Sequence, residues 1–255
     1  MPYLTLITLA ALPSLIWLLF YLRKDNHPES NAMILFVFFM GITAAVPVIF
    51  IEKYLIDLLN KTFFPQYLIS FLQIFFAVAF FEELFKYLVI KLTVLKSSEL
   101  DEPLDIILYM IISALGFAFL ENLLIFFSPW LFFWEIKKLF LLSLFRSISA
   151  TFLHALASGI LGFFLAWGFF EIKKKKIFFL IGLSLATLLH GLYNLGIITL
   201  ERLTSSLNNT PEDIGIRIAI LINIFLIVIM ITAMAIFVSK GFKKLKKIAS
   251  VCKIK

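Results

Sequence analysis

The chain has few charged residues and almost no cysteine. Only 15% of its 255 residues are Asp, Glu, Lys or Arg, and the mean hydropathy is +1.04. The single cysteine, Cys252, excludes an internal disulfide and a cluster of thiolate metal ligands. The sequence also lacks any long polar stretch from which a water-soluble domain could be built. These shortages argue against a secreted disulfide scaffold and against a separate soluble domain.

The apolar content is correspondingly high. Apolar residues make up 62% of the chain, against about 45–50% in an average soluble domain, and 31 residues are Phe. A soluble fold of this length has no interior large enough for so much apolar surface, and disordered chains are poor in aromatic residues. The composition therefore predicts an all-α, polytopic membrane protein, with one integral membrane domain over residues 1–255.

About seven apolar runs are long enough to cross a bilayer, which requires about 20 mostly apolar residues. They cover residues 3–22, 31–51, 67–95, 105–127, 139–170, 177–199 and 214–238. The runs are too long for barrel strands and do not alternate strictly between polar and apolar residues, so helices are predicted. We therefore expect a transmembrane helical bundle of about seven spans.

Basic residues gather at the ends of alternate runs. The net charge of +7 is therefore interpreted as an orientation signal, and the predicted partner is the lipid bilayer rather than nucleic acid. The richer side holds Arg23, Lys24, Lys91, Lys96, Lys173, Lys174, Lys175, Lys176 and a basic tail at 240–255, and the poorer side holds Lys53, Lys61, Lys137, Lys138 and Arg202. Because the richer side faces the cytoplasm, we predict the N-terminus outside and the C-terminus, with its basic tail, inside.

Several ionisable residues interrupt the apolar runs. They are Glu82, Glu83, Lys86, Glu121, Arg146, His154 and His190. A charge at the centre of a membrane helix costs about 2.5–3.5 kcal/mol on insertion scales, so four unpaired charges would cost roughly 10 kcal/mol, which rivals a typical folding stability of about 5–15 kcal/mol. These residues are therefore expected to meet in one polar pocket of a motif-bearing core at about 67–199.

Local spacing adds detail to this pocket. Lys86 lies one helical turn after Glu82 and Glu83, and one lysine cannot neutralise two carboxylates. His190 and Asn194 are four residues apart, so they share one face of a helix. A pocket with carboxylates, two imidazoles and carboxamides suits water activation, in which Glu is a general base and His and Asn stabilise an oxyanion. The sequence contains no evident Ser-His-Asp arrangement or nucleophilic Cys in the spans.

A metal site would use the same residues. His154, His190 and Glu82 could form a two-His, one-carboxylate site that lowers the pKa of a water bound to a divalent metal such as zinc. The sequence has no HExxH motif, and a lysine beside the carboxylates disfavours a cation. We therefore favour a site without a cofactor. Arg146, near the outer end of its span, is expected to pair with Glu121 in a supporting role.

Four segments of the core resemble the motifs of a known family. The segment 82–86 (EELFK) resembles the EExxK motif of PrsW-type intramembrane proteases, and 117–122 (FAFLEN), which contains Glu121 and Asn122, matches their FxxxEN motif. His154 with Gly159 and His190 with Asn194 resemble their third and fourth motifs. All four occur in the family's order, each on a separate predicted span, and the family is related to the CAAX-prenyl and bacteriocin-processing membrane proteases.

The resemblance implies a glutamate-dependent membrane endopeptidase, historically described as a metalloprotease, in a prokaryotic cell membrane. It implies that Glu82 activates water, that Glu83 and Lys86 orient Glu82, and that His154 polarises the water. His190 and Asn194 would stabilise the oxyanion, with Glu121 and Asn122 as supporting residues. The implied partner is a membrane-anchored protein substrate, and an anti-sigma factor cut on its extracytoplasmic side is one candidate.

Two other function classes fit the same composition. A proton- or cation-coupled transporter also places Glu and His in mid-membrane, but we find no matching pair of interrupted helices in two halves of the chain. A non-catalytic membrane scaffold would bind partners without cutting them. Gradient-dependent flux would indicate the transporter, and a stable complex with intact substrate would indicate the scaffold.

Overall fold

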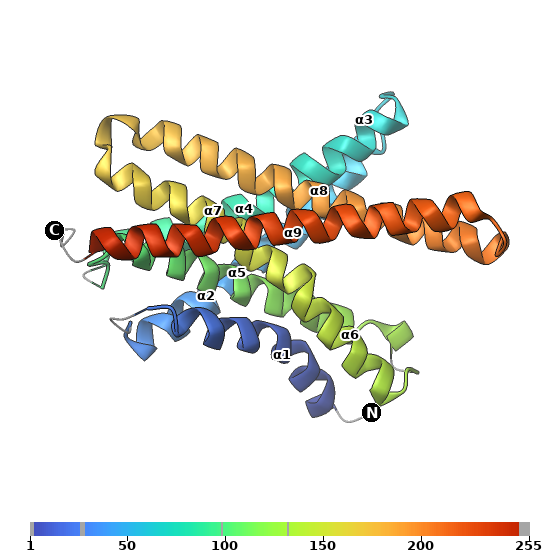
Figure 1. Cartoon of the computed structure of the whole chain (residues 1–255), viewed down its shortest axis with the longest axis horizontal. Coiled ribbons are helices and arrows are strands. Elements are labelled where there is room, and N and C mark those ends of the chain that lie inside the picture. The colour runs from blue at the N-terminus through green and yellow to red at the C-terminus, as the bar shows by residue number, and fades with distance from the viewer. Residues whose placement is uncertain (1–2, 26–28, 98, 132, 250–255) are drawn as a thin grey trace.

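The computed structural model describes residues 3–25, 29–97, 99–131 and 133–249, and these ranges contain helices but no strand (Figure 1). Among them, seven segments are long and apolar enough to cross a membrane, which confirms the predicted all-α bundle. These are α1 (Tyr3–Leu22), α2 (Asn31–Leu59), a composite third span within Gln66–Lys96, α5 (Pro103–Phe126), the paired helices α6 (Ile136–Ile148) and α7 (Ala150–Phe170), α8 (Lys175–Asn209) and α9 (Ile214–Ala249).

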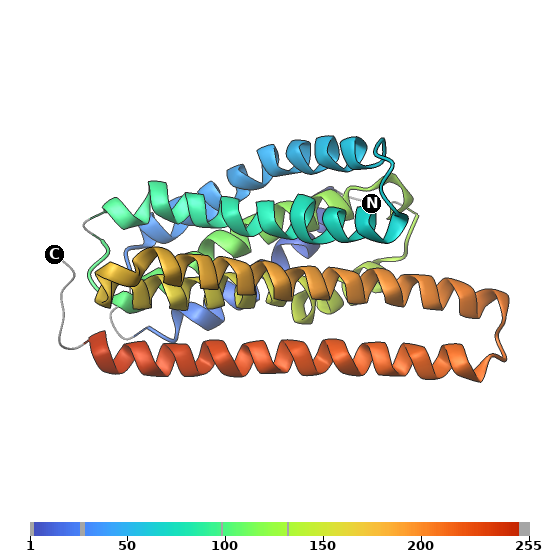
Figure 2. The same cartoon turned by 90° about the horizontal axis from the view of Figure 1, so that it is seen from above.

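Helix α5 is the centre of the bundle and contacts α1, α2, α4, α7 and α9 (Figure 1). Its most apolar stretch is 89% buried, whereas the corresponding stretch of α9 is only 6% buried. A helix that is apolar all round can be covered either by protein or by lipid: other helices enclose α5, while α9 leaves most of its apolar surface for lipid. The core of the protein therefore surrounds α5, and α9 lies along one edge of the bundle (Figure 2).

Two glycines let α2 cross α5 at close range. A Cβ added to Gly116 would lie 2.0 Å from the carbonyl oxygen of Phe38, and a Cβ added to Gly41 would lie 2.2 Å from that of Ser113. Membrane helices use such small residues to bring their backbones together, because lipid supplies no hydrophobic force to do so. The crossing fixes α2 against the central helix.

We expect Gly116→Ala to lower the free energy of unfolding by about 1–3 kcal/mol, because the added methyl group meets backbone atoms that cannot rotate away. Thermal unfolding in detergent measures the change. Gly168→Ala is the matched control, since the nearest atom to its added Cβ would be Lys175 Cα at 3.4 Å, an ordinary van der Waals distance. Equal melting temperatures for Gly116→Ala and Gly168→Ala would contradict the close crossing.

The third span changes its helical form along its length. It runs through α3 (Gln66–Phe71), the π-helix η1 (Leu72–Phe80), α4 (Phe81–Leu92) and the short 3₁₀-helix η2 (Val94–Lys96). The wider turns of a π-helix are rare and occur often beside functional sites. Here the π-helix ends at Phe80, two residues before Glu82.

The fifth span consists of two helices. Between α6 and α7, Ser149 has φ −117° and ψ −97°, outside the helical region, and its hydroxyl group donates to the carbonyl oxygen of Phe145 at 2.6 Å. The two parts then pack differently: α6 contacts α1 and α7, while α7 contacts α5 and α8. The break at Ser149 thus lets α6 pack against α1 while α7 packs against α5 and α8.

Three helices extend beyond the predicted spans. Helix α2 ends at Leu59 rather than near residue 51, α8 ends at Asn209, and α9 continues through most of the expected basic tail to Ala249. Phe242 and Leu245 of this extension are buried, and Phe242 stacks on Tyr21 at 5.7 Å between ring centroids. Packing against the bundle holds this part of the tail in the last helix. Cys252 and the rest of 250–255 lie outside the described residues.

The loops that carry most of the lysines lie at one end of the bundle (Figure 2). We call this the lysine-rich end, and it comprises Arg23, Lys24, Lys96, Lys173 to Lys176 and the last turns of α9. Lys246 Nζ donates to the backbone oxygen of Lys24 at 3.4 Å across it. The grouping agrees with the predicted alternation of loops, and the orientation in the membrane stays a prediction.

Candidate active site

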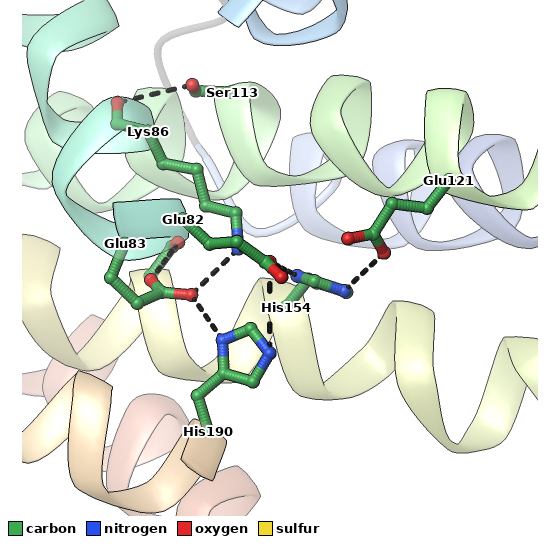
Figure 3. A network of polar contacts seen from close by, with 8 residues as sticks. Glu82, Glu83, Lys86, Ser113, Glu121, His154 and His190 are labelled. Atoms are coloured by element: carbon green, nitrogen blue, oxygen red, sulfur yellow. Dashed lines mark hydrogen bonds and ion pairs between the residues drawn. The ribbon is translucent and has the colours of Figure 1, made fainter. Parts of the chain in front are cut away.

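The ionisable residues of the third to sixth spans meet inside the bundle (Figure 3). They are Glu82, Glu83 and Lys86 of α4, Glu121 of α5, His154 of α7 and His190 of α8. All except Glu121 are buried, and the Glu121 side chain is 25% exposed. The structure therefore brings together, from four helices, six of the residues that the sequence singles out.

Lys86 lies between the acidic residues and the first histidine. Its Nζ atom is 2.8 Å from Glu83 Oε1, 3.2 Å from Glu82 Oε2 and 2.7 Å from His154 Nδ1 (Figure 3). These contacts use all three hydrogens of the ammonium group. Burying a cation is tolerated only when hydrogen bonds and opposite charges replace the lost water, and Lys86 has both.

His154 links Lys86 to Glu121. Because an ammonium group can only donate, His154 Nδ1 accepts from Lys86, and the ring hydrogen of the neutral imidazole is on Nε2. His154 Nε2 lies 2.8 Å from Glu121 Oε2, to which it donates. Both ring nitrogens are therefore used, which holds the ring in place.

Glu83 orients the second histidine. Glu83 Oε1 lies 3.0 Å from His190 Nδ1, and Glu83 Oε2 accepts from Ser158 Oγ at 2.9 Å. A hydrogen on His190 Nδ1 leaves Nε2 as an acceptor, and Nε2 is 3.8 Å from Glu82 Oε2. That separation is too long for a direct hydrogen bond and suits a water molecule that binds both atoms.

A cavity of about 640 Å³ begins at this point and opens to the outside of the bundle. Glu82, Glu121, His154 and His190 line its inner end, whereas Glu83 and Lys86 do not line it. Its walls come from the end of α2, η1, the end of α5, α6, the start of α7 and α8, and most of the wall residues are apolar. The polar wall residues are Gln73, Arg146, Ser149, Tyr193 and Asn194. A cavity with apolar walls and polar side chains at its inner end can hold an extended peptide, with one of its peptide bonds next to Glu82.

The predicted supporting residues have separate roles. Asn122 donates through Nδ2 to Thr151 Oγ1 at 3.1 Å, and its Oδ1 accepts from Arg146 Nε. Arg146 is thus hydrogen-bonded to Asn122, while Glu121, its expected partner, acts on it electrostatically. Asn122 fastens α5 to α6 and α7. Asn194 lies on the cavity wall one turn beyond His190.

Sequence reasoning missed two residues of this region. Ser158 follows His154 by four residues on one helix face, and that spacing is the signal that could have identified it as a partner of the site. Glu52 lies just beyond the predicted span, which ends at residue 51. Because α2 continues to Leu59, the Glu52 carboxyl group instead lies where Glu82 and Glu121 act on it electrostatically.

The donor atoms for a metal are close together, but Lys86 stands among them. Glu82, His154 and His190 carry potential ligand atoms that lie within 4.8 Å of one another, and zinc binds such atoms at about 2.0–2.2 Å. Lys86 Nζ, however, already contacts Glu82 Oε2 and His154 Nδ1. A dication bound to those atoms would stand beside an ammonium group, so the residues as arranged do not fit a metal ion.

Comparisons with known proteins find related membrane proteases. A family model described as PrsW family intramembrane metalloprotease matches residues 29–238. Protease PrsW of Oceanobacillus iheyensis is 30% identical over 191 residues, which cover 75% of this chain and 82% of that protein. Protease PrsW of Bacillus subtilis is 30% identical, covering 69% of this chain and 74% of its own length, and that of Geobacillus kaustophilus is 28% identical, covering 72% and 75%. No solved structure matches the chain.

Proposed function

Since the chain belongs to the PrsW family of intramembrane proteases, we propose that it hydrolyses a peptide bond of a membrane-anchored protein with a water molecule activated by Glu82. One observation carries the proposal: Glu82, His154 and His190 line the inner end of a cavity, with potential ligand atoms within 4.8 Å of one another. These polar side chains, which are costly in contact with lipid, are gathered at the inner end of an apolar cavity, where a bound peptide can reach them.

The two adjacent glutamates have different roles in this proposal. Glu82 lines the cavity and leaves room for water between its Oε2 and His190 Nε2. Glu83 is fully buried, and both of its carboxylate oxygens already accept hydrogen bonds. Glu82 is therefore the general base, and Glu83 is a positioning residue that holds Lys86 and His190.

The reaction proceeds in two steps. The water oxygen attacks the carbonyl carbon while Glu82 takes one proton, and His190 Nε2 holds the other hydrogen of the same water. The side-chain amide of Asn194 donates to the oxyanion of the tetrahedral intermediate. The carbon–nitrogen bond then breaks as the proton passes from Glu82 to the leaving nitrogen. His154 acts as a positioning residue here, because both of its ring nitrogens are already bonded.

The proposed peptidase is of the glutamic type. The contacts of Lys86 with Glu82 and His154 support this choice over a metallopeptidase, because a bound dication and the ammonium group would repel each other. We expect cleavage in purified, reconstituted protein to survive a strong chelator with less than about a twofold loss of rate. Loss of activity in the chelator, restored by zinc and not by magnesium, would contradict the glutamic assignment.

The cavity supports a membrane-anchored substrate. Apolar wall residues such as Ile74, Leu142 and Ile198 suit an apolar segment, and Gln73 and Asn194 can bond the peptide groups of a segment that has unwound. With the N-terminus outside, the cut would fall within or just beyond the outer half of the bilayer. A membrane-anchored anti-sigma factor is the substrate that we propose to examine first.

Terminal sequencing of membrane-protein fragments tests the function. The wild-type protein is expected to produce fragments that are missing when Glu82→Gln replaces it at equal abundance. The same proteins in sealed vesicles should show no flux that depends on an imposed proton gradient. Identical fragment sets for the two proteins would reject the protease assignment for this site, and flux without fragments would favour a transporter.

A further inference from the structure

Arg146 is the only Lys or Arg among the described residues that line the cavity. It belongs to the part of the fifth span whose cavity-lining residues are three and four positions apart, which places them on one helix face. They are Leu142, Phe145 and Arg146 of α6 and Ser149 at the break. Glu82 and His190 line the same cavity, so Arg146 faces the space in which the proposed reaction takes place.

The protein uses only part of the guanidinium group of Arg146. Its Nε atom donates to Oδ1 of Asn122, which anchors the group beside α5. Glu121 acts on the group electrostatically but forms no ion pair with it. Within the described part of the chain, Nη1 and Nη2 make no hydrogen bond, and they are not among the enclosed polar atoms that lack a partner. These two nitrogens are therefore open to the cavity.

The two open nitrogens of Arg146 match a carboxylate. The guanidinium group is planar and always charged, and two of its nitrogens can donate parallel hydrogen bonds to the two oxygens of one carboxylate. The bond from Nε to Asn122 fixes the plane of the group and leaves the end with Nη1 and Nη2 for a ligand. Because most of the cavity wall is apolar, an ion pair inside it is weakened less by water than one on an exposed surface.

The place of Arg146 along the cavity indicates which part of the substrate would carry this carboxylate. An acidic side chain at the inner end would be repelled by Glu82 and Glu121. Arg146 precedes His154 by eight residues, in the direction away from the lysine-rich end. At 1.5 Å per helical residue this is roughly 12 Å, which an extended peptide covers in about four residues.

We propose that Arg146 is a specificity-determining residue, which binds the carboxylate of a substrate Asp or Glu within about four residues of the cut, on the side away from the lysine-rich end. This inference rests on the proposed function and adds a feature of its substrate. A lipid phosphate has similar chemistry, but a headgroup bound to Arg146 would fill the cavity in which the peptide lies. The peptide carboxylate is therefore the ligand that fits the reaction.

Competing substrates measure this preference. The probe is the membrane-anchored substrate found by fragment sequencing, with Glu or Gln placed in turn at each position near the cut. The Glu and Gln forms are mixed in vesicles of neutral phosphatidylcholine, so the ratio of their fragments gives the ratio of kcat/KM. At one position we expect the wild-type protein to prefer Glu by at least about tenfold, the effect of one charged hydrogen-bonded contact. Arg146→Gln should reduce that ratio to less than about twofold.

The ratio separates recognition from a structural role. Both substrates meet the same protein, so a variant that is merely less stable or less active loses rate on both and keeps its preference. Arg202→Gln is the matched control, because Arg202 is exposed on α8 and does not line the cavity. It should keep the wild-type ratio.

Three results would decide against the inference. Equal cutting of Glu and Gln at every position, or a preference that survives Arg146→Gln, would overturn the role of Arg146 while leaving the protease intact. A rate that changed with added phosphatidylglycerol but not with the acidic residue would assign the guanidinium group to a lipid phosphate and also overturn this role. Absence of any fragment with the wild-type protein would overturn the proposed function and, with it, this inference.

Discussion

Replacing Glu82 by Gln is expected to reduce the rate of peptide cleavage by about 10²- to 10⁴-fold, the usual contribution of a general base. The carboxamide has nearly the same shape and still lines the cavity, but it cannot take a proton from water. The site around it is otherwise preserved, because Lys86 keeps its contacts with Glu83 and His154. The initial rate of fragment formation from a co-reconstituted substrate measures the change.

Glu201→Gln is the matched control for this experiment. Glu201 is an exposed glutamate on α8, outside the residues that line the cavity. Its replacement should leave the rate within about twofold, since exposed side chains away from a site rarely matter by more than about 0.5 kcal/mol. If Glu82→Gln retained more than a tenth of the wild-type rate while folded, another group would have to be the base.

Replacing Lys86 by Met is expected to destabilise the protein by about 3–5 kcal/mol, the usual result of removing one partner from a buried ion pair. Glu82 and Glu83 would lose the ammonium group that both contact, and His154 Nδ1 would lose its donor. Such a loss is a large part of a typical stability of about 5–15 kcal/mol. Thermal unfolding in detergent, together with the yield of folded protein, measures it.

A double variant identifies the cause of that loss. Adding Glu83→Gln to Lys86→Met removes one of the two buried negative charges that have lost their counter-ion. The double variant should therefore be more stable than Lys86→Met alone. Lys91→Met, an exposed lysine later in α4, is the matched control and should have little effect. If Lys86→Met and Lys91→Met melted alike, Lys86 would not be the counter-ion of the site.

The broad architecture could be predicted because the bilayer imposes it locally. A span requires about 20 apolar residues, and every backbone polar group must be bonded within its own helix. Each span can therefore be predicted from its own sequence, without knowledge of the helices that pack against it. Residues such as Glu82 and His190 were recognisable for the same reason: a charge or an imidazole among apolar residues is costly wherever the helix packs.

Helix lengths and interruptions were less predictable. Helix α2 continues through Glu52 to Leu59, whereas composition alone suggested a span ending near 51. The hydropathy of the sequence predicted neither the π-helix η1 nor the break at Ser149. Both depend on how neighbouring helices pack, and not on the propensity of the segment itself.

The sequence by itself determined that this is a membrane-spanning helical protein and which polar side chains lipid would not accept. Only the tertiary structure decided how these side chains pair. It assigns Lys86 to both glutamates and to His154, and engages Glu83 fully while leaving Glu82 on the cavity. The physical reason is that hydrophobicity acts on each segment separately, whereas a hydrogen bond or an ion pair requires two particular atoms within about 3 Å, a condition that only the packing of several helices can satisfy.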